Sequence, residues 1–195
     1  MNPSNSEPSE DSERLNLILY CLRILMLRCV ESENLLDPRF LQLYDVSFPP
    51  NEKIPPVLLS RTIGKGGKMR YFYDSDLFVG FCLTFEYGGI SFVVYLAVSP
   101  TLRGEGYGSD ILDHVSSEEN LRGMFLTAEV TEGEGDDLRQ RHDRRRFYRR
   151  NGWKPTGIRV PGKIDMEVYV LDSDIPRDDI LRTRERFYDV IDGRL

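Results

Sequence analysis

The residues best suited to bind an anion stand in one short segment that has a glycine at every second position. Residues 103–108 read Arg-Gly-Glu-Gly-Tyr-Gly, and Ser109 follows. Glycine loses more backbone entropy on folding than other residues, so this spacing indicates a main chain that turns tightly or approaches another group closely. Peptide N–H groups that converge at a helix start bind anions, and Arg103 adds a fixed positive charge.

The flanking segments are those that such a site needs. Residues 93–98 (VVYLAV) form an apolar, β-branched run with the length of a strand that is buried on both faces. After the glycines, Ile111, Leu112 and Val115 recur at helical spacing. Strand, glycine loop and helix together predict a cradle for a pyrophosphate.

Two classes of protein use this arrangement, and the spacing separates them. The dinucleotide pattern G-x-G-x-x-G, begun at Gly104, puts its last position on Ser109, and several strand-like runs precede a unit that normally comes early in its domain. The pattern R-x-x-G-x-G fits, with Arg103, Gly106 and Gly108. An ordinary glycine-rich turn between strand and helix is the remaining alternative.

This stretch resembles the acetyl-CoA-binding motif of the GNAT N-acetyltransferase superfamily. A second similarity lies at residues 144–153 (RRRFYRRNGW), where members often carry Phe-Tyr, a few polar residues and Gly-Phe. Tyr148 stands at the tyrosine, and Trp153 replaces the phenylalanine. The resemblance covers residues 71–169. It implies acetyl-CoA as co-substrate and transfer of the acetyl group to an amine by direct attack.

The resemblance also implies roles around the cofactor. The backbones of Leu96 and Val98 are expected to bond the pantetheine arm, and the Val98 N–H to polarise the thioester carbonyl. The pyrophosphate is expected to be held by Arg103, Gly104, Gly106, Gly108 and Ser109.

Acid and base candidates follow from the same resemblance. Tyr148 is the expected general acid for the leaving thiolate, and a tyrosine that only packs is the alternative. Relatives often carry a carboxylate on one of two central strands, but Phe92 and Tyr95 occupy the first. Glu129 is the only carboxylate within the second, residues 125–130, and is the candidate base. A strand-end carboxylate that faces solvent is an equal alternative.

Composition limits the remaining classes. A chain of 195 residues with 40% hydrophobic and 30% charged residues fits one soluble globular domain. The net charge of −6 argues against a nucleic-acid binder. Three cysteines, an odd number without a C-x-x-C pair, favour buried thiols in a reducing compartment, so we expect a cytoplasmic protein. With two histidines and no zinc spacing, no metal site is predicted.

Two charged segments concern the partners. The acidic residues Glu132, Glu134, Asp136 and Asp137 follow Glu129 and favour a cationic amine acceptor, small molecule or peptide, with a solvated loop as the alternative. Seven arginines lie between Arg139 and Arg150, where a solvated helix face is the commonest explanation. Contact with a ribose phosphate of CoA is the second.

Hydrophobic patterning predicts an α/β (α+β) fold with a mixed, mostly antiparallel sheet. Residues 1–14 lack apolar residues to bury and are expected to be a disordered tail, and residues 15–172 a single GNAT-like domain. The segment 15–27 is too short for a bilayer, and residues 24–30 read as a first strand. Asp37 and Pro38 predict a helix start, and the prolines of residues 47–56 a stiff connection.

The other elements follow from periodicity and turn residues. Strands are expected at residues 69–73, 77–86 and 90–98 as a meander, then at 125–130 parallel to the last of these, and at 156–160 and 164–171 as a hairpin around Pro161-Gly162. Residues 64–68 (GKGGK) lack P-loop spacing and read as a hairpin loop. A helix capped by Asp136 or Asp137 is expected to end near Asn151.

The C-terminal segment, residues 173–195, is predicted to be an amphipathic helix. Ser173 or Asp174 would cap it, with Pro176 inside the first turn. The helix could dock on the domain or join a second subunit as a homodimer. Two other functions remain open, a non-catalytic acyl-CoA-binding or interaction module on the same fold and, disfavoured by the spacing, a nucleotide-dependent oxidoreductase.

Overall fold

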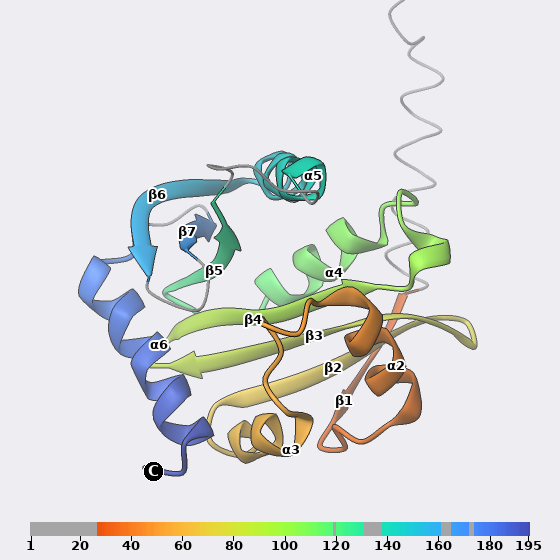
Figure 1. Cartoon of the computed structure of the whole chain (residues 1–195), viewed down its shortest axis with the longest axis horizontal. Helices are drawn as coiled ribbons and strands as arrows, with labels where there is room; N and C mark the ends of the chain where they lie inside the picture. The colour runs from red at the N-terminus through yellow and green to blue at the C-terminus, as the bar shows by residue number, and fades with distance from the viewer. Residues whose placement is uncertain (1–26, 119, 131–137, 161–164, 172–173) are drawn as a thin grey trace, which may run out of the picture.

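The computed structural model describes residues 27–118, 120–130, 138–160, 165–171 and 174–195 (Figure 1). Several sequence predictions lie outside these residues. They concern the tail at 1–14, the segment before Leu27, the acidic residues Glu132, Glu134, Asp136 and Asp137, the turn Pro161-Gly162, Cys21 and Ser173.

A seven-stranded sheet in the order β1-β2-β3-β4-β5-β7-β6 forms the centre of the molecule. The strands are β1 (Leu27–Ser32), β2 (Gly67–Asp74), β3 (Leu77–Tyr87), β4 (Ile90–Val98), β5 (Gly123–Glu129), β6 (Trp153–Val160) and β7 (Met166–Leu171). All neighbours pair antiparallel except β4 and β5, which pair parallel. The predicted α/β class, meander, parallel pair and C-terminal hairpin are confirmed.

Helices cover the sheet on both faces (Figure 1). The helices α2 (Pro38–Ser47), α3 (Pro56–Leu59) and α6 (Arg177–Ile191) pack against one apolar cluster. The helices α4 (Tyr107–Ser116) and α5 (Leu138–Arg150) pack against the other. Side chains along the strands alternate between the two clusters, as period-two patterning requires, except that Val94 and Tyr95 of β4 both pack against the first. None of the helices in the described ranges is long and apolar enough to cross a membrane.

Two helix starts show which local signals were decisive. Asp37 accepts a hydrogen bond from the Arg39 N–H at 2.8 Å with Pro38 as first helical residue, so the predicted cap is confirmed. The predicted start of α6 is wrong, because Pro176 is its N-cap and the helix begins at Arg177. Asp174 therefore lies before the cap.

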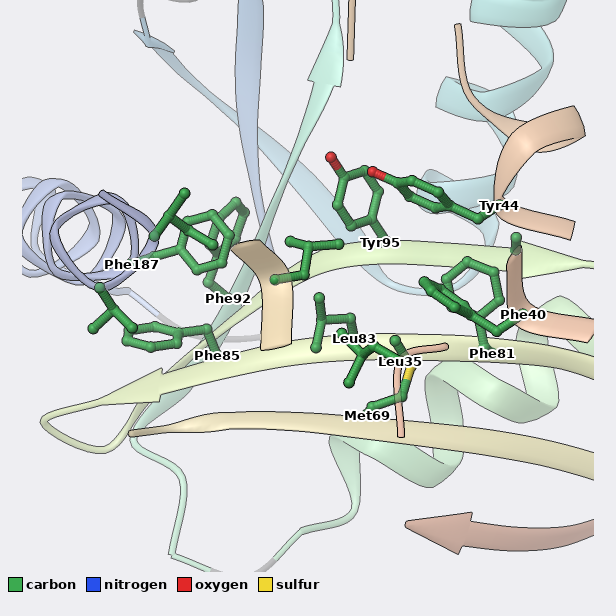
Figure 2. Packing of buried hydrophobic residues seen from close by; sticks show 14 of the residues in the cluster. Leu35, Phe40, Tyr44, Met69, Phe81, Leu83, Phe85, Phe92, Tyr95 and Phe187 are labelled. Atoms are coloured by element: carbon green, nitrogen blue, oxygen red, sulfur yellow. The ribbon is translucent and has the colours of Figure 1, made fainter. Parts of the chain in front are cut away.

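The C-terminal helix docks on the domain itself. Its Phe187 meets Phe85 of β3 and Phe92 of β4 edge-on, with ring centroids 5.5 and 5.7 Å apart (Figure 2). Ile180, Phe187 and Ile191 are buried, whereas Leu181 and Tyr188 are partly buried. α6 therefore completes the hydrophobic core on this face of the sheet.

The GKGGK segment holds the C-terminus, and the hairpin-loop prediction is wrong because the segment connects a helical turn to β2. Lys65 Nζ donates to the Leu195 carbonyl at 2.7 Å. A Cβ at Gly66 would lie 2.3 Å from the Glu86 carbonyl oxygen, and one at Gly67 2.2 Å from Thr62 Oγ1. Close packing against Glu86 and Thr62 therefore explains these two glycines, without a role in binding phosphate.

Candidate active site

The two central strands separate halfway along their length. β4 and β5 pair from Ile90↔Gly123 to Val93↔Leu126, and the described pairing ends there. At the same level β4 carries one extra residue, Val94, because Leu83 pairs with Tyr95 while Thr84 pairs with Val93. Figure 1 shows β5, β7 and β6 turning away from β1–β4. The second half of β4 therefore has a backbone edge that β5 does not pair.

The backbone groups of Leu96 and Val98 point to this edge. The Ser99 N–H donates to the Val79 carbonyl of β3 at 2.8 Å. Backbone directions alternate along a strand, so Leu96 and Val98 direct their N–H and C=O groups to the side away from β3. The Val98 carbonyl accepts from Arg103 Nε at 3.2 Å on that side. This unpaired edge offers hydrogen bonds to an extended ligand, as a neighbouring strand would.

The glycine loop opens α4 at the end of this edge. Gly106 is the N-cap with φ of 95°, a left-handed conformation that favours glycine. The Ser109 N–H donates to the Gly106 carbonyl at 2.9 Å, so an anion would meet Ser109 through its hydroxyl and the N–H groups of the preceding residues. Gly104 also has a positive φ, 89°.

Gly108 serves helix packing. A Cβ on Gly108 would lie 3.1 Å from the Phe147 ring of α5, closer than ordinary carbon contacts. The glycine thus brings α4 and α5 together at the mouth of the loop. The Tyr107 hydroxyl donates to Asp74 Oδ2 at 2.6 Å and ties the loop to the β2–β3 turn.

Arg103 lies between the glycine loop and the end of α2. Besides Val98, its guanidinium donates to Ser47 Oγ at the end of α2, at 3.3 Å. The side chain is exposed. Its charge therefore stands at the junction of β4, α2 and the glycine loop, and a contact with a pyrophosphate would replace these two hydrogen bonds.

Tyr148 lies on α5 within an aromatic group. Its ring centroid is 5.4 Å from Phe147, 6.4 Å from Trp153 and 6.1 Å from Tyr169. Burial raises the pKa of Tyr148 to about 12, and the Arg144 charge opposes this rise without overcoming it. The pKa of Tyr148 therefore stays above its ordinary value, because desolvation of the phenolate outweighs the effect of the arginine.

Glu129 ends β5 and is buried, with 6% of its surface exposed, so the alternative of a solvent-facing carboxylate is wrong. Arg144 donates to its Oε2 at 2.5 Å, and Arg141 Nε lies 3.6 Å from the same oxygen. The predicted solvated face thus describes only part of α5. Arg145 lies 3.5 Å from Glu167, while the Arg146 side chain is 72% exposed.

Glu52 is the site residue that sequence reasoning missed. It lies in the proline-rich segment between α2 and α3, and its Oε1 is buried with no hydrogen-bond partner among the described residues. Burial and the Glu129 charge raise the pKa of Glu52 to about 7, and Arg144 opposes them. The available signal was a carboxylate within the proline-rich segment that the sequence predicted to be a stiff connection.

Two tyrosines hold the Glu52 backbone in place. The Tyr95 hydroxyl donates to the Glu52 carbonyl at 2.6 Å and accepts from the Ile54 N–H at 3.2 Å. The Tyr44 hydroxyl donates to the Ile54 carbonyl at 3.0 Å. Figure 2 shows both hydroxyls on the same side of the sheet, and the rings are 5.1 Å apart. The segment is therefore stiffened by these bonds as well as by its prolines.

Three elements thus bring acid and base candidates together. The Glu52 charge acts on Tyr148 and raises its pKa, and Glu129 and Arg144 act on Glu52. A protonated phenol and a carboxyl whose pKa is raised to about 7 therefore lie close enough for their charges to interact. Such a pair can remove a proton from one reactant and supply one to another.

Comparison with known proteins identifies this arrangement. Residues 68–155 match the model of the acetyltransferase (GNAT) domain. The chain therefore contains a GNAT acetyltransferase domain. No curated protein matches the chain.

Solved structures share the GNAT fold. A protein of Bacteroides thetaiotaomicron named as a GNAT-family acetyltransferase is 21% identical with a TM-score of 0.66, over 85% of this chain and 97% of its own. A Bacillus subtilis acetyltransferase in complex with CoA is 13% identical, with a TM-score of 0.56 over 75% and 98%. An Arabidopsis thaliana protein in complex with the bisubstrate analogue CoA-Ac-MVNAL is 20% identical, with a TM-score of 0.54 over 74% and 97%.

The matched GNAT segment contains every site residue that the sequence predicted. The cofactor candidates gather along the unpaired β4 edge and the glycine loop, and Tyr148 and Glu129 lie together near Arg144. Glu52 and Ser47 lie before the matched segment and come from the wall formed by α2 and the chain that follows it.

Proposed function

We propose that this protein is an acetyl-CoA-dependent N-acetyltransferase that transfers the acetyl group to an amine by direct attack. The observation that carries the proposal is the unpaired edge of β4, which begins near Tyr95, the residue bonded to the Glu52 carbonyl, and ends at the glycine loop. The Bacillus subtilis relative was solved with CoA, which supports the same ligand class here.

The residues of the chain fit an extended ligand that ends in a pyrophosphate. Leu96 and Val98 supply backbone hydrogen bonds along the edge. Arg103, Gly104, Gly106, Gly108 and Ser109 supply positive charge, backbone N–H groups and a hydroxyl at the start of α4. Bound acetyl-CoA supplies the acetyl thioester, and the chain supplies positioning and proton transfer.

Proton transfer divides between two side chains. Glu52 accepts the proton that an ammonium acceptor must lose before its nitrogen attacks the carbonyl carbon. The Val98 N–H donates to the carbonyl oxygen as negative charge develops there. Tyr148, whose pKa of about 12 keeps it protonated at neutral pH, gives its proton to the leaving thiolate. The C–N bond forms and the C–S bond breaks, and the nitrogen loses its second proton, which restores the Tyr148 phenol. The products are the N-acetylated amine, the free thiol and a protonated Glu52, which returns its proton to solvent.

The acceptor is an amine of a peptide or small molecule. The Arabidopsis relative was solved with an analogue that joins CoA to the acetylated peptide MVNAL, which supports a peptide acceptor. Glu52 introduces an acidic group into the wall, which favours an acceptor that arrives as a cation.

A screen for thiol release tests the proposal. Purified protein is incubated with acetyl-CoA and a panel of peptide α-amines, lysine side chains and small amines, and free CoA thiol is followed with a disulfide reagent. We expect amine-dependent release and an acetylated product by mass spectrometry. Binding of CoA without release for any acceptor would favour the non-catalytic acyl-CoA-binding module.

Binding is measured separately by thermal shift. CoA at one hundred times its dissociation constant stabilises the native state by ~2.7 kcal/mol, and NAD is expected to leave Tm unchanged. Arg103→Ala should weaken the shift without unfolding the protein, because Arg103 is exposed and its contacts are two hydrogen bonds. Intact protein that shows no shift with CoA would contradict the proposal.

A further inference from the structure

We propose that the hydroxyls of Tyr95 and Tyr44 position the amine acceptor by fixing residues 52–54, and that these three residues help to select which amines react. Residues 52–54 form the wall segment, which lies in the chain between α2 and α3. The inference deepens the proposed function and rests on it. It assigns a role in acceptor selection to two tyrosines that transfer no proton.

Tyr95 stands at the point where the two central strands separate. The described pairing of β4 with β5 ends at Val93, and the extra residue Val94 comes directly before Tyr95. Leu96 and Val98 follow, and an extended ligand anchored at the glycine loop would run along them toward Tyr95. The acceptor therefore meets the acetyl end of such a ligand on the side of the edge where Tyr95 stands.

Both hydroxyls bond the main chain of the wall segment. Tyr95 donates to the Glu52 carbonyl at 2.6 Å, and Tyr44 donates to the Ile54 carbonyl at 3.0 Å. Both accept from the Ile54 N–H, Tyr95 at 3.2 Å and Tyr44 at 2.9 Å. A phenol has one proton to donate, and burial raises the pKa of both tyrosines, so both protons stay in these bonds near neutral pH. The two tyrosines therefore act as positioning residues and not as an acid or base.

The rings that carry these hydroxyls are themselves held in place. The Tyr95 side chain lies in the core, with its ring centroid 5.1 Å from Tyr44 and 4.8 Å from Phe48 at the end of α2, both in edge-on contact (Figure 2). Lys53, between the two bonded residues, returns to α2, where its Nζ donates to the Asp45 carbonyl at 2.7 Å. Each residue of the wall segment is therefore tied to β4, to α2 or to both.

These bonds decide where the wall segment lies. It belongs to no helix or strand of the described chain, and prolines precede and follow it, so regular backbone pairing does not hold it. Without the Tyr95 hydroxyl the Glu52 carbonyl loses its donor, and the segment can shift to find another. The unpaired β4 edge and the glycine loop do not depend on these bonds. Loss of the hydroxyl should therefore act on the acceptor and leave the cofactor unaffected.

Tyr95→Phe tests the role, because it removes the hydroxyl and keeps the ring. The best peptide acceptor of the panel is compared with the amide of its first residue, which has the same α-amine but covers less of the wall segment. The peptide kcat/KM should fall by up to ~10², the loss that a misplacement of ~1 Å can cause. The short amide should lose less, so the ratio of the two kcat/KM values should fall. The dissociation constant of CoA should stay unchanged.

Amide hydrogen exchange measures the hold on the wall segment without acetyl-CoA. The Ile54 N–H donates to both hydroxyls, so it should exchange faster in Tyr95→Phe and faster still in the double variant with Tyr44→Phe. NMR of ¹⁵N-labelled protein reports this amide. If Tyr95→Phe does not fold, Tyr44→Phe alone should change the exchange rate and the kcat/KM ratio in the same direction.

Tyr71→Phe is the matched control. Tyr71 is buried in the same apolar cluster, and its hydroxyl donates to the Asn34 carbonyl at 2.6 Å, away from the wall segment. It loses an equivalent bond and should leave the Ile54 exchange rate and the ratio of kcat/KM values unchanged.

The outcomes separate this role from the proposed function. Active wild type with an unchanged ratio in Tyr95→Phe, or an equal fall of that ratio in Tyr71→Phe, would overturn the positioning role and leave the proposed function standing. Unchanged Ile54 exchange in the double variant would also overturn it. Wild type that acetylates no acceptor would contradict the proposed function, and the positioning role with it.

Discussion

At the scale of single residues, electrostatics divides one cluster into different roles. Glu129 is buried against two arginines, whereas the nearby Glu52 has a carboxyl oxygen without a partner among the described residues. Environment alone therefore separates two carboxylates of similar chemistry. The pKa of Glu52, about 7, is close to that of a peptide α-amine, near ~7.7–8.0, and far below that of a lysine side chain, near ~10.4. We therefore expect kcat/KM to be higher for α-amines in the acceptor panel.

Glu52→Gln should lower kcat by ~10² or more, the usual contribution of general acid–base catalysis, while the affinity for CoA changes little. Steady-state kinetics and calorimetric titration with CoA measure the two effects. The control is Glu86→Gln. Glu86 lies near the C-terminal end of β3, and its side chain is 40% exposed and 4.0 Å from Lys68. A Glu52→Gln enzyme with normal kcat at all pH values would exclude this base.

Tyr148→Phe removes only the hydroxyl and keeps the ring that contacts Trp153 and Tyr169. Tm and CoA affinity should therefore change little, and kcat should fall by ~10². Because the pKa of Tyr148 is about 12, a decline of the wild-type rate between pH 8 and 10 would have to come from another group. Near-normal kcat in Tyr148→Phe would reduce the residue to core packing.

At the scale of elements, period and turn residues predicted most of the sheet, and packing decided what they could not. The alternation in β2 to β4 and the strand, loop and helix around Gly106 follow from local sequence. The separation of β4 from β5 was not predictable from local sequence. The extra residue, Val94, is defined only by the register between β3 and β4, in which Leu83 pairs with Tyr95 and Thr84 pairs with Val93. Glu52 was missed for the same reason, since the hydrogen bond that holds its backbone comes from Tyr95, forty-three positions away.

The contact between α4 and α5 can be tested at Gly108. Gly108→Ala places a Cβ 3.1 Å from the Phe147 ring, so the ring must move by a few tenths of an ångström against its own packing. We expect a loss of ~1–3 kcal/mol of unfolding free energy, the usual range for overpacking, together with weaker CoA binding. Urea denaturation measures the first. Phe147→Leu in the same chain removes the ring edge and should recover part of the stability, and no recovery would mean that the ring is not the obstacle.

At the scale of the whole molecule, the site lies where the two halves of the sheet diverge. The C-terminal helix α6 covers one face of that sheet. Phe187 of α6 contacts Phe85 and Phe92, and Phe92 stacks on Phe125 of β5 at 4.7 Å. Aromatic contacts therefore continue from the last helix across the parallel pair. The amphipathic pattern predicted the helix but not its partner surface, which depends on pairings far apart in the sequence.

Stability of the whole chain should therefore report the state of Glu52. Its pKa in the folded protein is raised from an ordinary value of 4.5 to about 7, so the folded state binds this proton more tightly than the unfolded chain does. The resulting stabilisation is complete below about pH 4.5 and is lost as pH rises through about 7. Glu52→Gln cannot lose a proton, so relative to wild type its Tm should rise between pH 5 and 8.

We expect this relative gain to be a few degrees, because ~1 kcal/mol shifts Tm by about 2–4 °C in a chain of this size. Differential scanning calorimetry of wild type and Glu52→Gln at pH 5 and pH 8 measures this difference in Tm. Glu86→Gln is the control, because that side chain is 40% exposed. A Tm difference between Glu52→Gln and wild type that stays constant with pH would mean that Glu52 titrates in the folded protein as it does in the unfolded chain. The carboxyl would then not be poised near neutrality.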